Sequence, residues 1–165
     1  NLDGLIRGFA SNEFLRKSAI LVLVGEGSQS EHLYGLTQKL SLQNEVHLVG
    51  YQKNTVDWYN VGDIFVLPSW SEGMPNAMIE AMAAGLAVIV TSVGVITDYL
   101  QNEKHALIVL PKNIDLLEKS MHRLIMDTNF RAKIALEGHV VAKTLFSVEL
   151  NTAKLGDIME DLIAK

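Results

Sequence analysis

Residues 64–85 read IFVLPSWSEGMPNAMIEAMAAG, and this stretch decides the fold class. Its first four residues, Ile64–Leu67, form a continuous apolar run of the kind found in strands that are covered on both faces. Residues 76–84 are rich in alanine and methionine and predict a mostly buried helix. Pro75 suits the first turn of that helix, where its missing N–H is no loss, and Gly85 suits the far end. We therefore expect a buried strand, a loop and a buried helix in succession.

The same alternation of short apolar runs and helical patterns continues along the chain. The runs that predict buried strands are residues 19–24, 46–49, 64–67, 86–90 and 106–109. The helical patterns lie near residues 5–14, 30–40, 55–59, 76–84, 95–100, 114–126, 130–144 and 148–164. Strands joined by helices at this spacing imply right-handed crossovers and a parallel sheet. We predict an α/β fold, a Rossmann-like doubly wound parallel sheet with a helical C-terminal tail.

Composition excludes several classes of protein. The 165 residues suffice for one domain with a sizeable core, and 48% of them are hydrophobic. A net charge of -5, with both signs interspersed, argues against a nucleic-acid partner. The absence of cysteine excludes disulfides, thiolate metal sites and a cysteine nucleophile, and it fits a cytoplasmic protein. The five histidines are scattered without ligand spacing, so we predict no metal site.

In doubly wound sheets, ligands bind beyond the carboxyl ends of the strands, so the loops there are the first candidates. After Val24 comes Gly25-Glu26-Gly27, which can let a phosphate approach the backbone. A third glycine is missing, because Ser30 stands in its place, and the alternative is an ordinary turn that needs positive φ. Tyr51, in the next loop, suits either a position beside a nucleobase or the edge of the core. We favour packing roles for Trp58, Tyr59 and Trp70.

Two glutamates around the predicted helix 76–84 carry the most specific chemistry. Glu80 lies one turn beyond Asn76 and shares its helix face. A carboxylate on an apolar segment needs hydrogen-bond donors, and the vicinal hydroxyls of a ribose suit one carboxylate well. Glu72 lies in the preceding loop, and the free amides of the first turn suit a diphosphate. The alternative for Glu80 is a solvated charge that favours the helix dipole.

Residues 71–85 resemble a long motif of glycosyltransferase family 4, "S-E-G-x-P-N-x-x-x-E-A-M-A-x-G", in which Glu72 and Glu80 are the two glutamates. Leu23-Val24-Gly25-Glu26-Gly27 resembles the family's "L-V-G-D-G", and residues 63–69 resemble its "A-D-x-F-V-L-P-S". Val46–Gly50 resembles "V-x-F-L-G", and residues 1–6 resemble the helix that follows the first strand of the family's C-terminal domain. The resemblance therefore covers nearly the whole chain.

The resemblance implies one half of a GT-B enzyme, with residues 1–165 as the nucleotide-sugar-binding C-terminal domain, without its first strand and without the N-terminal acceptor domain. It implies a retaining transfer from a UDP- or GDP-sugar without a metal or another cofactor. It makes Glu72 the catalytic candidate, facing the transferred sugar, and Glu80 the acceptor of hydrogen bonds from the ribose. The binding residues that it implies are Gly25, Gly27, Tyr51, Gly73, Met74, Asn76, Ala77 and Glu80.

The resemblance also implies partners: a nucleotide sugar, and a glycan or lipid-linked acceptor held by the N-terminal domain. The expected process is polysaccharide biosynthesis in the cytoplasm, with peripheral attachment of the complete enzyme to the inner face of the membrane where the acceptor is lipid-linked. On this basis we expect the chain alone to be inactive.

The sequence departs from the family at two places. The family's basic pair, an arginine and a lysine, would lie before Asn1, and Asp98 stands at the position of a usual glutamate. These departures keep a second reading open, a non-catalytic nucleotide-binding or scaffold domain. A third, the dinucleotide domain of an oxidoreductase, predicts a three-glycine fingerprint and an acidic end to the second strand, and neither is present.

Overall fold

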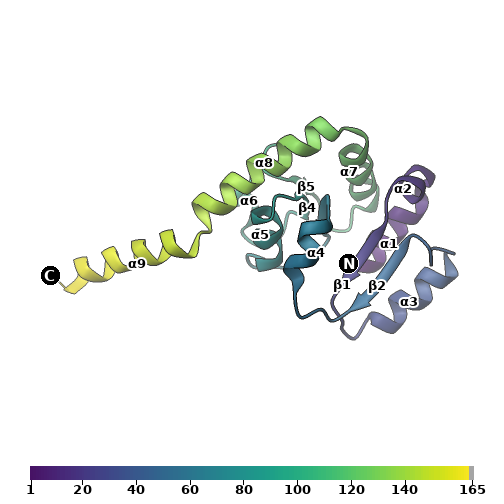
Figure 1. The fold of residues 1–165 in the computed structure, drawn as a ribbon, viewed down its shortest axis with the longest axis horizontal. Helices are drawn as coiled ribbons and strands as arrows, with labels where there is room; N and C mark the ends of the chain where they lie inside the picture. The colour runs from purple at the N-terminus through teal and green to yellow at the C-terminus, as the bar shows by residue number, and fades with distance from the viewer. Residues whose placement is uncertain (164–165) are drawn as a thin grey trace.

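The computed structural model describes residues 1–163, without the side chain of residue 161. Helices and strands alternate as predicted, with helices on both sides of a strand layer (Figure 1). The strands are β1 (Leu21–Val24), β2 (Val46–Gly50), β3 (Ile64–Leu67), β4 (Ala87–Thr91) and β5 (Leu107–Val109). The helices are α1 (Leu2–Ser11), α2 (Glu13–Ser18), α3 (Ser30–Lys39), α4 (Thr55–Val61), α5 (Asn76–Ala83), α6 (Ile96–Tyr99), α7 (Ile114–Met126), α8 (Thr128–Leu145) and α9 (Val148–Ile163). The last residue of the predicted helix 148–164 lies outside the described residues.

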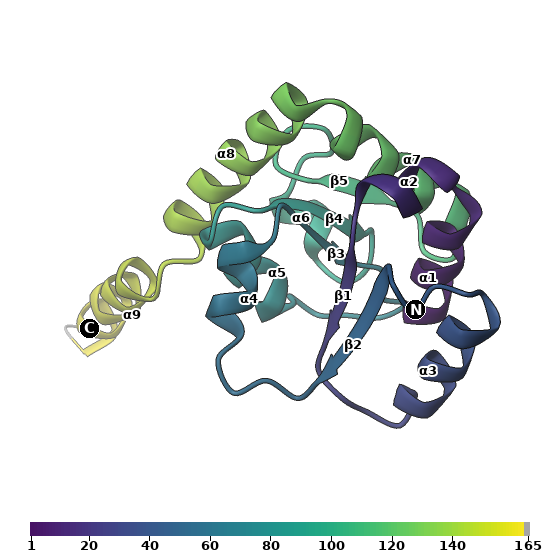
Figure 2. The same ribbon diagram turned by 45° about the vertical axis from the view of Figure 1, so that its right-hand side comes forward.

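The strands are parallel, as predicted, but within residues 1–163 they form two sheets rather than one. β1 pairs with β2, and β3, β4 and β5 pair in that order. Figure 2 shows β1 and β2 nearer the viewer than β3, β4 and β5, and residues of β1 and β3 line one cavity. Within each sheet the strands are parallel, so the loops that follow them meet at one edge of that sheet.

Side chains from β4 join two hydrophobic cores, one on each face of the strand layer. Ala87 and Ile89 belong to the core that also contains residues of α1, α3, α7, β1 and β2. Val88 and Val90 belong to the core formed with α5, α6 and the end of α8. Every residue of β4 is buried. Helices therefore cover both faces, and the doubly wound class predicted from the sequence is confirmed.

Turn and capping residues decide where the helices stop. The single helix expected near residues 5–14 is broken at Asn12, whose side chain accepts from the amides of Phe14 and Leu15 and so begins α2. Asp127 ends α7 and begins α8, accepting from the amide of Phe130 at 2.8 Å. Residues 128 and 129, expected in a break, are helical.

The capping role of Asp127 predicts the cost of removing it. We expect Asp127→Ala to lower the free energy of unfolding by about 1 kcal/mol, because the first turn of α8 loses its side-chain acceptor. Urea unfolding followed by circular dichroism measures this. Asp127→Asn is the control, since its side-chain oxygen keeps the acceptor, and equal losses in the two variants would contradict the capping role.

Candidate active site

A cavity of about 1500 Å³ opens between the two sheets and reaches the loops at the carboxyl ends of β1 and β3. Residues of β1, β3, α4 and α5 line it. Of the residues that the sequence analysis singled out, Gly25, Gly27, Ala77 and Glu80 contribute to this lining, and Glu72, Gly73, Met74, Asn76 and Tyr51 do not. The structure therefore brings one part of the predicted site together in the cavity and leaves the other part beside it.

The amino-terminal end of α5 is open to a ligand. Pro75 precedes the helix as its N-cap residue instead of lying in its first turn, as we had expected, and no described side chain caps this end. The first amides that turn back into the helix are those of Met78 and Ile79, which donate to the Pro75 carbonyl at 3.1 and 3.4 Å. The amides of Asn76 and Ala77 have no intrahelical acceptor, because they come too early in the helix. Such amides, at the positive end of a helix dipole, form an anion site.

Glu80 lies one turn further along α5, and Tyr59 of α4 holds it. The Tyr59 hydroxyl donates to the Glu80 carboxylate at 3.1 Å, and both residues line the cavity. The Tyr59 ring packs edge-on against Phe65 of β3, with ring centroids 5.9 Å apart. Burial, and then the hydrogen bond to Glu80, raise the pKa of Tyr59 to about 12. The hydroxyl therefore remains a donor throughout the physiological pH range, and one carboxylate oxygen of Glu80 has no such side-chain partner within residues 1–163.

Glu72 lies in a loop whose backbone is held by the loop after β4. Val95 donates its amide to the carbonyl of Gly73 at 3.4 Å. Gly94 has φ 60°, and a side chain there would collide with the carbonyl oxygens of Glu72 and Gly73. Glu72 itself is half-buried, whereas Asp98, on the short helix α6, is exposed. The position of Glu72 thus depends on a close backbone approach that only glycine permits.

The loop after β1 has the geometry of a closed turn. Gly25, with φ 118°, donates its amide to the Gly50 carbonyl at 2.8 Å. The amide of Gly27 donates to the Ser30 hydroxyl at 3.1 Å. Both amides already have acceptors, so this loop lines the cavity without offering these two donors to a phosphate. Tyr51, in the loop after β2, is 70% exposed and is therefore not an edge of the core.

Two features of the candidate site were not predicted from the sequence. Trp70, for which we favoured packing, is 61% exposed, so that interpretation was wrong. Its ring lies 5.8 Å from the ammonium of Lys112, a residue of the loop after β5 with φ 66°. Tyr59 packs against the core, as we favoured, and it also donates to Glu80, which we had not predicted. Contacts between residues so far apart in the chain leave no local signal in the sequence.

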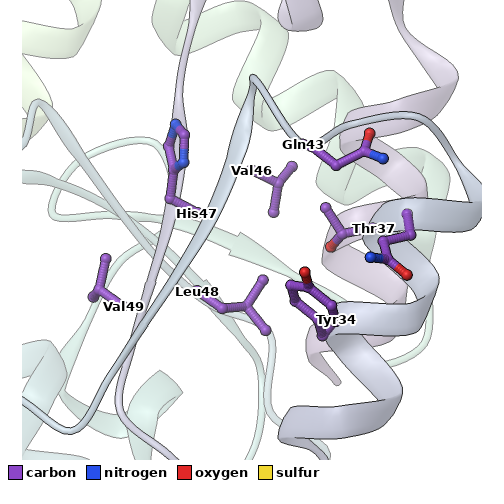
Figure 3. A pocket seen from close by; sticks show the side chains of 8 residues that line it. Tyr34, Thr37, Gln43, Val46, His47, Leu48 and Val49 are labelled. Atoms are coloured by element: carbon purple, nitrogen blue, oxygen red, sulfur yellow. The ribbon is translucent and has the colours of Figure 1, made fainter.

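A second, smaller pocket of about 380 Å³ lies between α3 and β2. Figure 3 shows Tyr34 and Thr37 of α3 on one side of it and Val46 and Leu48 of β2 on the other. None of the predicted site residues lines it. Within residues 1–163 there is also no group of three or more histidines, aspartates and glutamates arranged to hold a metal ion. None of the described helices combines the length and hydropathy that a membrane span requires.

The chain is similar to known glycosyltransferases. The family described as "Glycosyl transferases group 1" matches residues 1–139. The lipopolysaccharide core biosynthesis glycosyltransferase LpsD of Rhizobium meliloti is 30% identical over 162 residues, which are 98% of this chain and 46% of LpsD. The chain therefore spans less than half the length of this relative.

Solved structures with the same fold also extend beyond the matched part. Sucrose-phosphate synthase from Thermosynechococcus elongatus superposes with a TM-score of 0.86 at 25% identity, covering 98% of this chain and 42% of that one. HepE of Anabaena, solved in complex with UDP, gives a TM-score of 0.87 at 20% identity, covering 96% and 44%. Both likenesses place this chain in one half of a GT-B fold.

The contact between Gly94 and the Glu72 loop predicts a selective effect of adding one methyl group. We expect Gly94→Ala to lower the free energy of unfolding by at least about 1 kcal/mol, because alanine is strained at positive φ and its methyl group displaces the loop. Gly35→Ala is the matched control, since Gly35 lies in α3 with open space around it and should gain about 0.5–1 kcal/mol. Chemical denaturation measures the free energy of unfolding of both variants. If Gly94→Ala leaves this free energy unchanged, the close approach of Gly94 to the Glu72 loop is contradicted.

Proposed function

This chain belongs to the glycosyl transferases group 1 family, and we propose that it binds the nucleotide-sugar donor of a retaining glycosyltransferase that assembles a polysaccharide or glycolipid. One observation carries the proposal: α5 presents free amides at its start and a carboxylate one turn later, and Ala77 and Glu80 line the same cavity. A nucleoside diphosphate has the complementary order of groups, an anionic diphosphate beside a ribose with two vicinal hydroxyls.

The diphosphate would accept hydrogen bonds from the amides of Asn76 and Ala77. Backbone amides and the helix dipole stabilise an anion without a metal ion, and they need no reorganisation when the ligand arrives. This matters in a chain with a net charge of -5, because general electrostatic attraction does not favour an anionic ligand. The binding energy has to come from local, oriented groups, and α5 supplies them.

The ribose would donate its hydroxyls to Glu80. Tyr59 orients this carboxylate by donating to one of its oxygens at 3.1 Å. The remaining acceptor positions are free for the sugar, and hydrogen bonds to a charged acceptor are about twice as strong as those between neutral groups. Tyr59 is therefore a positioning residue in this proposal, and Glu80 a binding residue.

Glu72 would face the transferred sugar from its half-buried loop, with Gly73 and Met74 leading back toward α5. The nucleobase would lie toward the loops after β1 and β2, which contain Gly25, Gly27 and Tyr51. HepE was solved with UDP, which supports a uridine nucleotide, and GDP is the alternative. The name of LpsD supports a glycan or lipid-linked acceptor.

The acceptor would bind to polypeptide outside these residues, because the chain provides half of the two-domain cleft. We therefore propose that residues 1–165 alone transfer no sugar, and that the complete enzyme works in the cytoplasm, attached to the membrane where its acceptor is lipid-linked. The closed loop at Gly25 and Gly27 favours a second candidate, a scaffold domain that kept the fold and binds no nucleotide.

Calorimetric titration with UDP and GDP tests the proposal. We expect the protein to bind one of them, and Glu80→Gln to weaken that binding about tenfold or more, because a charged acceptor of ribose hydrogen bonds is lost. The matched control is Glu160→Gln, which removes an exposed carboxylate from α9 and should leave the affinity unchanged. If neither nucleotide gives a heat of binding, the scaffold domain is favoured. If Glu80→Gln and Glu160→Gln weaken nucleotide binding equally, Glu80 is not part of the binding site.

Tyr59→Phe tests the orientation of Glu80 separately. We expect the affinity for UDP to fall by roughly fivefold, equivalent to about 1 kcal/mol, because the carboxylate loses its fixed donor. Titration with 2′,3′-dideoxy-UDP provides the control, since this ligand lacks the hydroxyls that Glu80 would bind and should be unaffected by the substitution. If Tyr59→Phe weakens both ligands equally, Tyr59 has a general structural role instead.

A further inference from the structure

The last residue of β4 is a threonine whose hydroxyl group contacts the chain that follows β3. The Thr91 hydroxyl donates to the carbonyl oxygen of Ser69 at 2.6 Å, and the carbonyl oxygen of Leu67 lies 3.5 Å from it. Thr91 is 2% exposed, so water competes little for this hydrogen bond. The bond joins residues that are 22 positions apart in the sequence. The Thr91 side chain therefore connects the ends of two neighbouring strands.

This side-chain bond acts where the backbone pairing of β3 has ended. The last pair between β3 and β4 is Leu67 with Val90. Pro68 comes next and has no N–H to donate. β4 continues to Thr91, whose backbone pairs on its other side with Val109 of β5. The Thr91 hydroxyl thus extends the attachment of the chain after β3 by two residues beyond the last pair.

The loop after β3 has a second point of attachment to the loop after β4. The carbonyl of Gly73 accepts from the amide of Val95 at 3.4 Å, and Gly94 lies against the carbonyl oxygens of Glu72 and Gly73. Ser69 and Gly73 are therefore the two fixed points of this loop. Glu72 lies in the span of three residues between them, directly before the second point.

Side chains within that span add little to its attachment. Trp70 is 61% exposed, and its ring meets the ammonium of Lys112 at 5.8 Å from the ring centroid instead of packing in the core. Ser71 is exposed and Glu72 is half-buried. The position of the Glu72 carboxylate thus depends on where the backbone is held, at Ser69 and at Gly73.

We propose that Thr91 is a positioning residue for Glu72, because its hydroxyl fixes the backbone from which Glu72 reaches the transferred sugar. The inference rests on the proposed function, in which Glu72 faces the sugar and the start of α5 binds the diphosphate. Met78 and Ala81 hold α5 in the core independently of Thr91. Loss of the hydroxyl therefore impairs recognition of the sugar and leaves recognition of the diphosphate in place.

Loop mobility in the full-length protein, measured by ¹⁵N relaxation without nucleotide, tests the attachment. We expect Thr91→Val, which exchanges the hydroxyl for a methyl group, to lower the order parameters of Trp70 and Glu72 from about 0.85 to below about 0.6. Thr91→Ser keeps the hydroxyl and should keep the loop rigid. Thr37→Val is the matched control, since Thr37 is also buried and donates to a backbone carbonyl at 2.9 Å, but within α3.

Calorimetric titration of the same variants with UDP and with UDP-glucose separates positioning from a general structural role. We expect Thr91→Val to weaken the binding of UDP-glucose about fivefold or more and to change that of UDP by less than about twofold. Thr91→Ser should restore the binding of UDP-glucose. In the Glu72→Gln protein, adding Thr91→Val should have no further effect, because Thr91 acts through Glu72. GDP and GDP-glucose replace these ligands if the protein binds the guanine nucleotide.

Two results would overturn the proposal. Unchanged order parameters in Thr91→Val would mean that the hydroxyl does not hold the loop. An affinity for UDP-glucose that Thr91→Val leaves unchanged, or lowers together with the affinity for UDP, would mean that Thr91 does not act through Glu72. Failure of the proposed function gives a different result: no nucleotide or nucleotide sugar binds the unaltered protein, and the order parameters alone then decide whether Thr91 holds the loop.

Discussion

Burial of β4 on both faces is the constraint on which the rest of the structure depends. Its side chains alternate between two cores, so helices have to pack on each side of the strand layer. On one side that helix is α5, which carries Met78, Ala81 and Met82 into the core and starts at the carboxyl edge of the sheet. The open amides at its start are thereby fixed in direction, because the apolar face of α5 cannot rotate away. The anion site that we propose at the start of α5 would follow from this packing of the core.

The helices and strands could largely be predicted from the sequence, but the contacts between segments far apart in the chain could not. The strand Ile64–Leu67 was predicted with its observed bounds, and the helix after Pro75 ends before Gly85 as expected. These features depend on local patterns of apolar residues, proline and glycine. The hydrogen bond from Tyr59 to Glu80 spans 21 residues, and the contact of Gly94 with the Glu72 loop is also non-local. Side chains that meet only after folding leave no periodicity by which they could be found.

The exposure of β1 shows how a disagreement between sequence and structure can be informative. Its apolar pattern predicts a covered strand, and the structure leaves that pattern facing a cavity. A mistaken assignment of the strand does not explain this, because β1 pairs with β2 as a parallel strand.

We propose that the start of α5 and Glu80 form the recognition surface for a nucleoside diphosphate. Titration of the ¹⁵N-labelled protein with UDP, followed by amide chemical shifts, tests it most directly. We expect the resonances of Asn76 and Ala77 to move most, because their N–H groups would contact the diphosphate, and that of Glu80 to move with them. Shifts confined to the pocket between α3 and β2, or to the loop at Gly25 and Gly27, would contradict it.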